Sequence, residues 1–240
     1  RKECYIREFS IEHFHDSKVF ETLIPKICKI FREENEELTG FENEEILAEY
    51  QIYKTPGYVY MKGNVQIYSA GKQAADISAF PEGIAVAVGS EEDVPDICPD
   101  QTIDKVFTIE NLTSFYRFKQ EHSLVIYLGG YHNHSRRNLL MQIYQKLPDA
   151  QYYHFGDLDA GGFYILEHLK RKTGIPFQMF QMDIETLKKY EDYAKPLTEN
   201  DKKRLMQLEK MELPDEERKL ITYMLQKGIK LEQECISESQ

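Results

Sequence analysis

The chain lacks several features that mark particular classes of protein. Its four cysteines, Cys4, Cys28, Cys98 and Cys235, lie far apart and form no CxxC pair. This argues against a zinc ribbon or a disulfide framework and is typical of a reducing cytoplasm. No apolar run approaches the ~18 residues of a membrane span, and the first residues show no signal-peptide pattern. We therefore expect a cytoplasmic protein and, because position 1 is not methionine, a piece of a longer one.

Basic residues are also in short supply. Lysine and arginine number 30 against 41 acidic residues, which gives a net charge of −11. Proteins that coat nucleic acid are usually basic, so this balance argues against tight, nonspecific DNA binding by this chain alone. It does not exclude a metal-dependent enzyme, because carboxylates recruit cations and a partner can supply basic surface.

The first hundred residues predict a smaller α/β segment. Apolar residues at helical spacing predict helices over 16–35 and 43–53. Turn residues between two short apolar runs predict a β-hairpin of strands 58–61 and 65–68. Glycine, proline and acidic residues predict a loop over 89–104.

From residue 105 onward, strand and helix patterns alternate, which predicts βαβ units and a mainly parallel sheet flanked by helices. Helix caps then predict a charged helical extension over 183–240. We expect an N-terminal α/β segment at 1–100 and a catalytic domain at 101–240 that includes this extension. The predicted strands are 105–110, 123–128, 151–156 and 177–182, and the helices between them are 112–120, 135–147 and 161–172.

Two aspartates stand one residue apart, between a predicted strand and a glycine-rich helix start. Asp157 and Asp159 can face one side of an extended chain. Gly161 and Gly162 allow close backbone approach, and the free N–H groups of a helix start suit a phosphate. Glu110 ends a strand one βαβ unit upstream, and ligands of open α/β sheets bind at such strand ends. Three carboxylates gathered there predict a site for a hard divalent cation, which commonly acts on phosphates.

These residues resemble a Toprim domain, the metal-binding fold of topoisomerases, primases and several nucleases. In that family a strand-end glutamate precedes a DxD motif, and Glu110, Asp157 and Asp159 take those places. The chain also resembles the JetD proteins, the nuclease subunits of the bacterial Wadjet plasmid-defence system. The phrases that carry this second resemblance are Asp16-Ser17-Lys18, Glu110-Asn111, Gly129-Gly130, Gly156-Asp157-Leu158-Asp159-Ala160-Gly161-Gly162-Phe163 and Leu231-Glu232-Gln233-Glu234.

The resemblance covers most of the chain and implies a Toprim-like, Rossmann-like α/β fold related to the A subunit of type IIB topoisomerases. It implies a Mg²⁺- or Mn²⁺-dependent endonuclease that hydrolyses plasmid DNA. Glu110, Asp157 and Asp159 are then expected to be catalytic and to bind the metal. Expected partners are double-stranded DNA, an SMC-like condensin complex and a second copy of the chain. The residues alone leave open a helix-capping pair for the aspartates and a solvated strand end for Glu110.

Further residues are candidates for supporting roles. Glu232 and Glu234 belong to a phrase that recurs in the resembled family, so they are expected at a second metal position or beside the first. A charged terminal helix is the alternative. Arg136, Arg137 and Lys18 are candidate contacts for DNA phosphate, with a solvated helix start as the alternative for Lys18.

Other functions remain open at this point. A topoisomerase-like transesterase would need a nucleophilic tyrosine, and no tyrosine here can be aligned with one. A DxD glycosyltransferase would bind a sugar nucleotide through Mn²⁺ and would not need Glu110. A phosphatase with a DxDx[T/V] pattern would place threonine or valine at Gly161. A scaffold without catalysis would not need all three acids.

Overall fold

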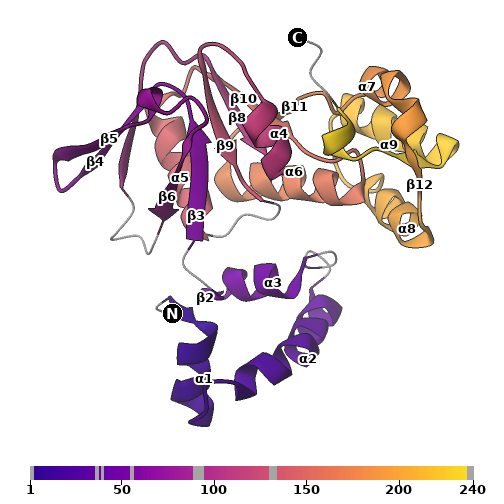
Figure 1. Cartoon of the computed structure of the whole chain (residues 1–240). Helices are drawn as coiled ribbons and strands as arrows, with labels where there is room; N and C mark the ends of the chain where they lie inside the picture. The colour runs from indigo at the N-terminus through magenta and orange to yellow at the C-terminus, as the bar shows by residue number, and fades with distance from the viewer. Residues whose placement is uncertain are drawn as a thin grey trace.

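The computed structural model describes residues 3–35, 38, 41–54, 57–88, 95–129 and 134–236. A mixed α/β fold is built on a central sheet whose strand order is β11-β10-β8-β9-β3-β6, with helices on both faces (Figure 1). β8, β9, β10 and β11 run parallel, β3 runs against β9, and β6 runs against β3. The prediction of a mainly parallel sheet flanked by helices is therefore confirmed. The sheet strands are β3 (Gly57–Lys62), β6 (Ile84–Val88), β8 (Lys105–Ile109), β9 (Ser123–Tyr127), β10 (Gln151–Phe155) and β11 (Gln178–Met179).

The central strands are mostly apolar because helices cover both faces of the sheet, with Thr108 and His154 as fully buried exceptions. Alternate residues point to opposite faces. On one face, Val106 and Tyr152 pack in a cluster with α5 (His134–Lys146) and α6 (Ala160–Thr173). On the other face, Phe107 and Phe155 pack with α4 (Leu112–Arg117) and with the C-terminal extension. The sequence predicts all three helices within a few residues of these bounds.

The predicted hairpin of strands 58–61 and 65–68 is wrong. β3 pairs with β6 and β9, whereas β4 (Val65–Ser69) pairs with β5 (Lys72–Asp76) and β7 (Asp96–Pro99) in a separate three-stranded sheet. Gly63, with φ of 137°, passes so close to β9 that a Cβ there would lie 2.5 Å from the carbonyl oxygen of Ser123. The glycine therefore serves a close approach between strands and not a hairpin turn. β7 also lies within the predicted loop at 89–104, of which residues 89–94 are outside the described part.

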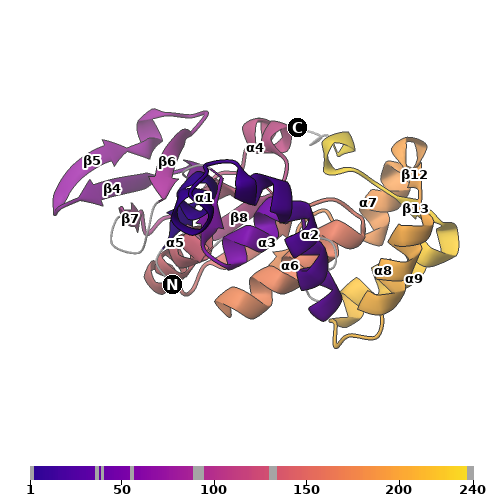
Figure 2. The ribbon, with the colours of Figure 1, turned by 90° about the horizontal axis from the view of Figure 1, so that it is seen from below.

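Three helices form the N-terminal part of the chain. They are α1 (Ile6–Phe14), α2 (Val19–Glu34) and α3 (Asn43–Glu49), and two short strands, β1 (Cys4–Tyr5) and β2 (Ile52–Tyr53), pair beside them. The helix predicted at 16–35 is confirmed as α2, and the one predicted at 43–53 ends earlier because the chain turns at Gln51, with φ of 62°. Figures 1 and 2 show these helices beneath α5 and α6, and their core includes Ile165 of α6.

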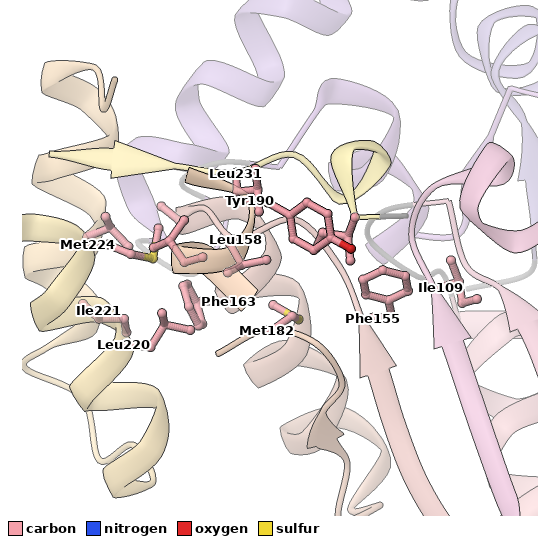
Figure 3. Packing of buried hydrophobic residues seen from close by; sticks show 14 of the residues in the cluster. Ile109, Phe155, Leu158, Phe163, Met182, Tyr190, Leu220, Ile221, Met224 and Leu231 are labelled. Atoms are coloured by element: carbon pink, nitrogen blue, oxygen red, sulfur yellow. The ribbon is translucent and has the colours of Figure 1, made fainter. Parts of the chain in front are cut away.

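Helices make up most of the C-terminal extension up to Lys227, as its caps predict, and a short strand lies between two of them. Asp183 accepts a hydrogen bond from the Thr186 N–H at 2.7 Å, and Gly228 ends the last helix in the left-handed region. Leu158, Phe163, Ile221 and other apolar side chains join this extension to the sheet (Figure 3). The elements are α7 (Ile184–Lys189), β12 (Lys195–Pro196), α8 (Glu199–Leu208), α9 (Asp215–Lys227) and β13 (Ile229–Lys230).

Strands from both predicted parts of the chain form one central sheet. β3 and β6 come from the first hundred residues, and β8 to β11 from the rest. The division near residue 100 stays a prediction. Among the described helices, none is both long enough and apolar enough to cross a membrane.

Candidate functional site

Glu110 directly follows β8, and its side chain lies across the end of the neighbouring strand β10. Its N–H donates to the carbonyl of Phe155 at 3.1 Å, which continues the β8–β10 ladder by one residue. A Cβ at Gly156 would lie 2.1 Å from Glu110 Oε1, so only glycine leaves room for this carboxyl group. The parallel register thus brings Glu110 to the residue that precedes Asp157.

Asp157 and Asp159 stand on either side of Leu158, which is buried and pairs with Leu231 through two backbone hydrogen bonds of 2.9 and 3.1 Å. Asp159 caps α6, because its Oδ1 accepts the Gly162 N–H at 3.0 Å. The capping role considered as an alternative is therefore real for Asp159. It uses one carboxylate oxygen and does not exclude a ligand on the other.

The three carboxylates influence one another, because they are gathered where few positive charges offset them. Burial first, and then the charge of Asp159, raise the pKa of Glu110 well above its ordinary value. The pKa of Asp157 is raised to about 7: burial raises it most, a hydrogen bond from the Gln233 N–H lowers it, and the charges of Glu110, Asp159 and Glu232 raise it. Desolvation and like charges thus act in the same direction. The site favours any event that brings positive charge to it.

Glu110 has a buried partner that the sequence analysis did not identify. His154, on β10, is fully buried, and its Nε2 lies 2.8 Å from Glu110 Oε1. Burial lowers the pKa of His154 to about 3, whereas the pKa of Glu110 is raised. The imidazole is therefore neutral near neutral pH, and the contact is a hydrogen bond and not an ion pair. A histidine within an otherwise apolar strand was the signal in the sequence.

The end of the chain closes the site from the other side. Gln233 is fully buried, and it makes three hydrogen bonds to the two strand ends. Its N–H donates to Asp157 Oδ1 at 2.7 Å, its Nε2 donates to the Phe155 carbonyl at 3.0 Å, and its Oε1 accepts the Asn111 N–H at 3.0 Å. The phrase around Gln233 was noted in the sequence for its glutamates, and the glutamine between them is the residue that holds the strand ends.

The two glutamates of that phrase lie beside the site. Glu232 pairs with Lys195 on β12 and raises the pKa of Asp157. Glu234 Oε1 accepts a hydrogen bond from Asn111 Nδ2 at 2.6 Å. They lie in and around a 3-10 turn, Gln233–Cys235, and not in a terminal helix. Their predicted role in metal binding stays a prediction.

The three predicted DNA contacts lie on other elements. Arg136, in the first turn of α5, donates to the carbonyl of Leu128. Arg137 is buried and forms an ion pair with Glu49 of α3. Lys18 is exposed and immediately precedes α2. Their contact with DNA phosphate stays a prediction, and for Arg137 it requires a buried ion pair to open.

A cavity of about 360 Å³ lies next to the carboxylate cluster. α4 forms one wall, and Phe155, Glu234 and Ile236 form the other. Arg117 and Lys119 also line it, together with the acidic Glu82. A polyanion that entered this cavity would meet both basic and acidic side chains.

The donor set fits a hard divalent cation. Carboxylate oxygens are the ligands that Mg²⁺ prefers, and Mg²⁺ keeps several waters when one or two carboxylates bind it. Each of the three carboxylates commits one oxygen to the contacts described above. Within the described residues, no three His, Cys, Asp or Glu side chains form a ready set of metal ligands. The site therefore suits an ion held by one or two carboxylates and water, and not a preformed three-ligand cage.

Two comparisons with known proteins bear on this site. A sequence model of the family described as Wadjet protein JetD, C-terminal, matches residues 92–240. That range contains every residue of the carboxylate cluster. The Wadjet protein JetD of Bacillus cereus (strain Q1) is 30% identical in an alignment of 235 residues that covers 96% of this chain and 56% of the relative. The chain thus spans about half the length of that relative.

Proposed function

The chain belongs to the Wadjet JetD family, and from this membership and the buried carboxylates we propose that it is the DNA-cleaving part of a Wadjet-type defence subunit. The proposed activity is that of a Mg²⁺- or Mn²⁺-dependent endonuclease that hydrolyses phosphodiester bonds in plasmid DNA. The observation that carries it is the meeting of Glu110 with Asp157 and Asp159 at the ends of neighbouring parallel strands. A Toprim-type metal site has this order of residues.

Asp157 and Asp159 are the proposed metal-binding residues. Bound there, a divalent cation would offset the charge that develops on a phosphate in the transition state. Asp157 approaches the site from a backbone fixed by Leu158 and Leu231, and the N–H of Gln233 orients its carboxylate. Asp159 is fixed as the cap of α6. Both carboxylates are thus held before any ligand arrives, which lowers the entropic cost of binding.

Glu110 is the proposed third member, as a metal-binding residue or a general acid/base. Its raised pKa means that Glu110 holds a proton more readily than an exposed glutamate does, as a general acid requires. Its Oε1 faces His154, so its Oε2 is the atom that would meet a water or a leaving oxygen. Water is the proposed nucleophile, because none of the site residues described above is a tyrosine.

The proposed partners are double-stranded DNA, an SMC-like complex and a second copy of the chain. The net charge of −11 repels DNA at long range. A complex that presents DNA to the site would overcome this repulsion, and Arg117 and Lys119 in the adjacent cavity would then contact the backbone. Weak cleavage by the isolated chain, and stronger cleavage within the complex, follow from this arrangement.

Cleavage of a supercoiled plasmid tests the proposal. The full-length protein that contains this chain is assayed, with its partner complex, in Mg²⁺, Mn²⁺ and EDTA. Asp157→Ala is compared with Asp149→Ala, which changes an exposed aspartate in the turn before β10. Metal-dependent linear or nicked DNA that vanishes only in the Asp157 variant supports a nuclease at this site. Protein-linked DNA ends would instead favour a topoisomerase-like transesterase. Equal cleavage by both variants would remove the site from the mechanism.

A further inference from the structure

A row of hydrogen-bonded polar side chains runs from the middle of the central sheet to Glu110. Thr108 and Glu110 are two residues apart on and just after β8, so their side chains share one face of the sheet. His154 stands directly opposite Thr108 on β10. His154 Nδ1 lies 2.9 Å from Thr108 Oγ1, and His154 Nε2 lies 2.8 Å from Glu110 Oε1. Thr108 and His154 are both fully buried.

Core packing alone does not account for a histidine at this position. Transferring a neutral imidazole from water into a protein core costs free energy unless both ring nitrogens find hydrogen-bond partners. Phenylalanine or leucine would fill the same space without that requirement, and other buried positions on this face of the sheet, such as Val106 and Ile126, are of that kind. Here both nitrogens have a partner, and one of the partners is the carboxyl group of the proposed site.

The chain of hydrogen bonds can run in two directions. Thr108 Oγ1 also lies 3.2 Å from the carbonyl oxygen of Tyr153. When the hydroxyl group donates to His154 Nδ1, the ring proton sits on Nε2 and is donated to Glu110. When the hydroxyl group donates to the Tyr153 carbonyl, it accepts from Nδ1–H, and Nε2 accepts from Glu110. The imidazole therefore holds Glu110 whether that group is charged or neutral.

The space around Glu110 restricts the side chain to this arrangement. Gly156 lies against Glu110 Oε1, so the carboxyl group is confined between the backbone of β10 and the imidazole. A Cβ at Gly156 would also come within 3.0 Å of His154 Nε2. Gly156 and His154, two residues apart, thus both lie against Glu110 Oε1.

We propose that His154 is a positioning residue, which holds Glu110 through the Thr108–His154–Glu110 hydrogen bonds so that its second oxygen faces the Asp157 and Asp159 carboxylates. This inference rests on the proposed metal site and deepens it. Partners that orient a metal-binding side chain typically contribute 10- to 100-fold to metal affinity. The same range is the expected contribution of His154.

Two substitutions of His154 test the contribution of each ring nitrogen separately. The amide of asparagine reaches the place of Nδ1, so His154→Asn keeps the Thr108 contact and loses the one to Glu110. The amide of glutamine reaches the place of Nε2, so His154→Gln keeps a donor for Glu110 and loses the contact to Thr108. His168→Asn is the control, because His168 is also buried and packs against Phe41, away from the carboxylate cluster.

Mn²⁺ binding by the folded chain is measured by calorimetry, with thermal unfolding of each metal-free variant alongside. His154→Asn should weaken Mn²⁺ binding about 10- to 100-fold. His154→Gln should restore most of that affinity, and His168→Asn should bind as wild type does, whatever its melting temperature.

Each other outcome overturns a definite statement. Wild-type affinity in His154→Asn, or equal weakening in all three variants, would show that His154 is only a core residue. Absence of Mn²⁺ binding to wild type, with Asp157→Ala indistinguishable from it, would refute the proposed metal site itself and the inference with it.

Discussion

Replacing Asp157 with asparagine should stabilise the metal-free protein at alkaline pH. Burial first, and then nearby carboxylates, raise the pKa of Asp157 to about 7, whereas an unfolded chain releases this proton near about 3.9. The folded state therefore keeps a proton that the unfolded state has lost, and the free energy of unfolding falls as pH rises from about 4 to about 7. Asparagine carries no charge and keeps an oxygen that accepts the Gln233 N–H.

The magnitude follows from the two pKa values. One pKa unit corresponds to about 1.4 kcal/mol. Compared with a group whose pKa does not change on folding, the raised pKa of Asp157 therefore lowers the free energy of unfolding by about 4 kcal/mol at pH 8 and by about 1.5 kcal/mol at pH 5. The free energy of unfolding of Asp157→Asn, relative to that of wild type, should therefore be roughly 2–3 kcal/mol higher at pH 8 than at pH 5. His154 and His168 have pKa values lowered to about 3, but their effect is common to both proteins and cancels in the difference.

Urea unfolding in EDTA at pH 5 and pH 8 measures this difference. The midpoint should rise in the variant at pH 8 without a change in the slope, which reports the surface exposed on unfolding. Asp149→Asn, in an exposed turn, should match wild type at both pH values. A variant that differs from wild type by the same amount at pH 5 and pH 8 would refute the reasoning, because Asp157 would then carry no raised pKa.

Two further predictions concern the glycines at positions 156 and 162 and the hydrogen bonds of Gln233. Gly156→Ala should weaken Mn²⁺ binding, because the new Cβ would lie 2.1 Å from Glu110 Oε1 and 3.0 Å from His154 Nε2, so the Glu110 carboxyl group would have to move. Gly162→Ala should lower the free energy of unfolding by about 1–3 kcal/mol, and by more than Gly156→Ala, because its Cβ would lie 2.2 Å from the backbone oxygen of Asp157, which cannot move aside as the end of a side chain can. Urea unfolding and calorimetry of both variants check this, and the reverse order would contradict it. Gln233→Ala should cost about 1–3 kcal/mol for each buried partner left without a hydrogen bond, and should speed amide exchange at the end of the chain. Unchanged exchange there would show that another contact holds this segment.

The strand ends that carry the carboxylates were predictable because the signals are local. β8 and β10 are short, mostly apolar runs; Glu110 follows the first directly, Gly156 and Asp157 follow the second, and the structure places both strands within one residue of the prediction. Caps at Asp183 and Gly228 set the C-terminal helices for the same reason. In each case, neighbouring residues in the sequence settle the backbone conformation.

The remaining features depend on partners far away in the sequence. Gly63 marks a turn by its type, and only the position of β9, some sixty residues later, shows that it is a point of close contact. His154 and Gln233 acquire their roles through Glu110, Asn111 and Asp157, at separations of 44, 122 and 76 residues. No local pattern encodes such pairings, so sequence reasoning found the carboxylates and missed the side chains that hold them.

These long-range contacts bear on how the proposed nuclease would be controlled. Asp157 is oriented by the backbone of Gln233, and Leu158 beside it pairs with Leu231. The C-terminal segment is thus one wall of the carboxylate cluster, and the site is complete only when that segment is in place. Because α9 leads directly into it, a partner that binds and shifts α9 would alter the orientation of Asp157 without touching the site. Under the proposed function, control of DNA cleavage by the assembled complex therefore requires no new residue at the strand ends.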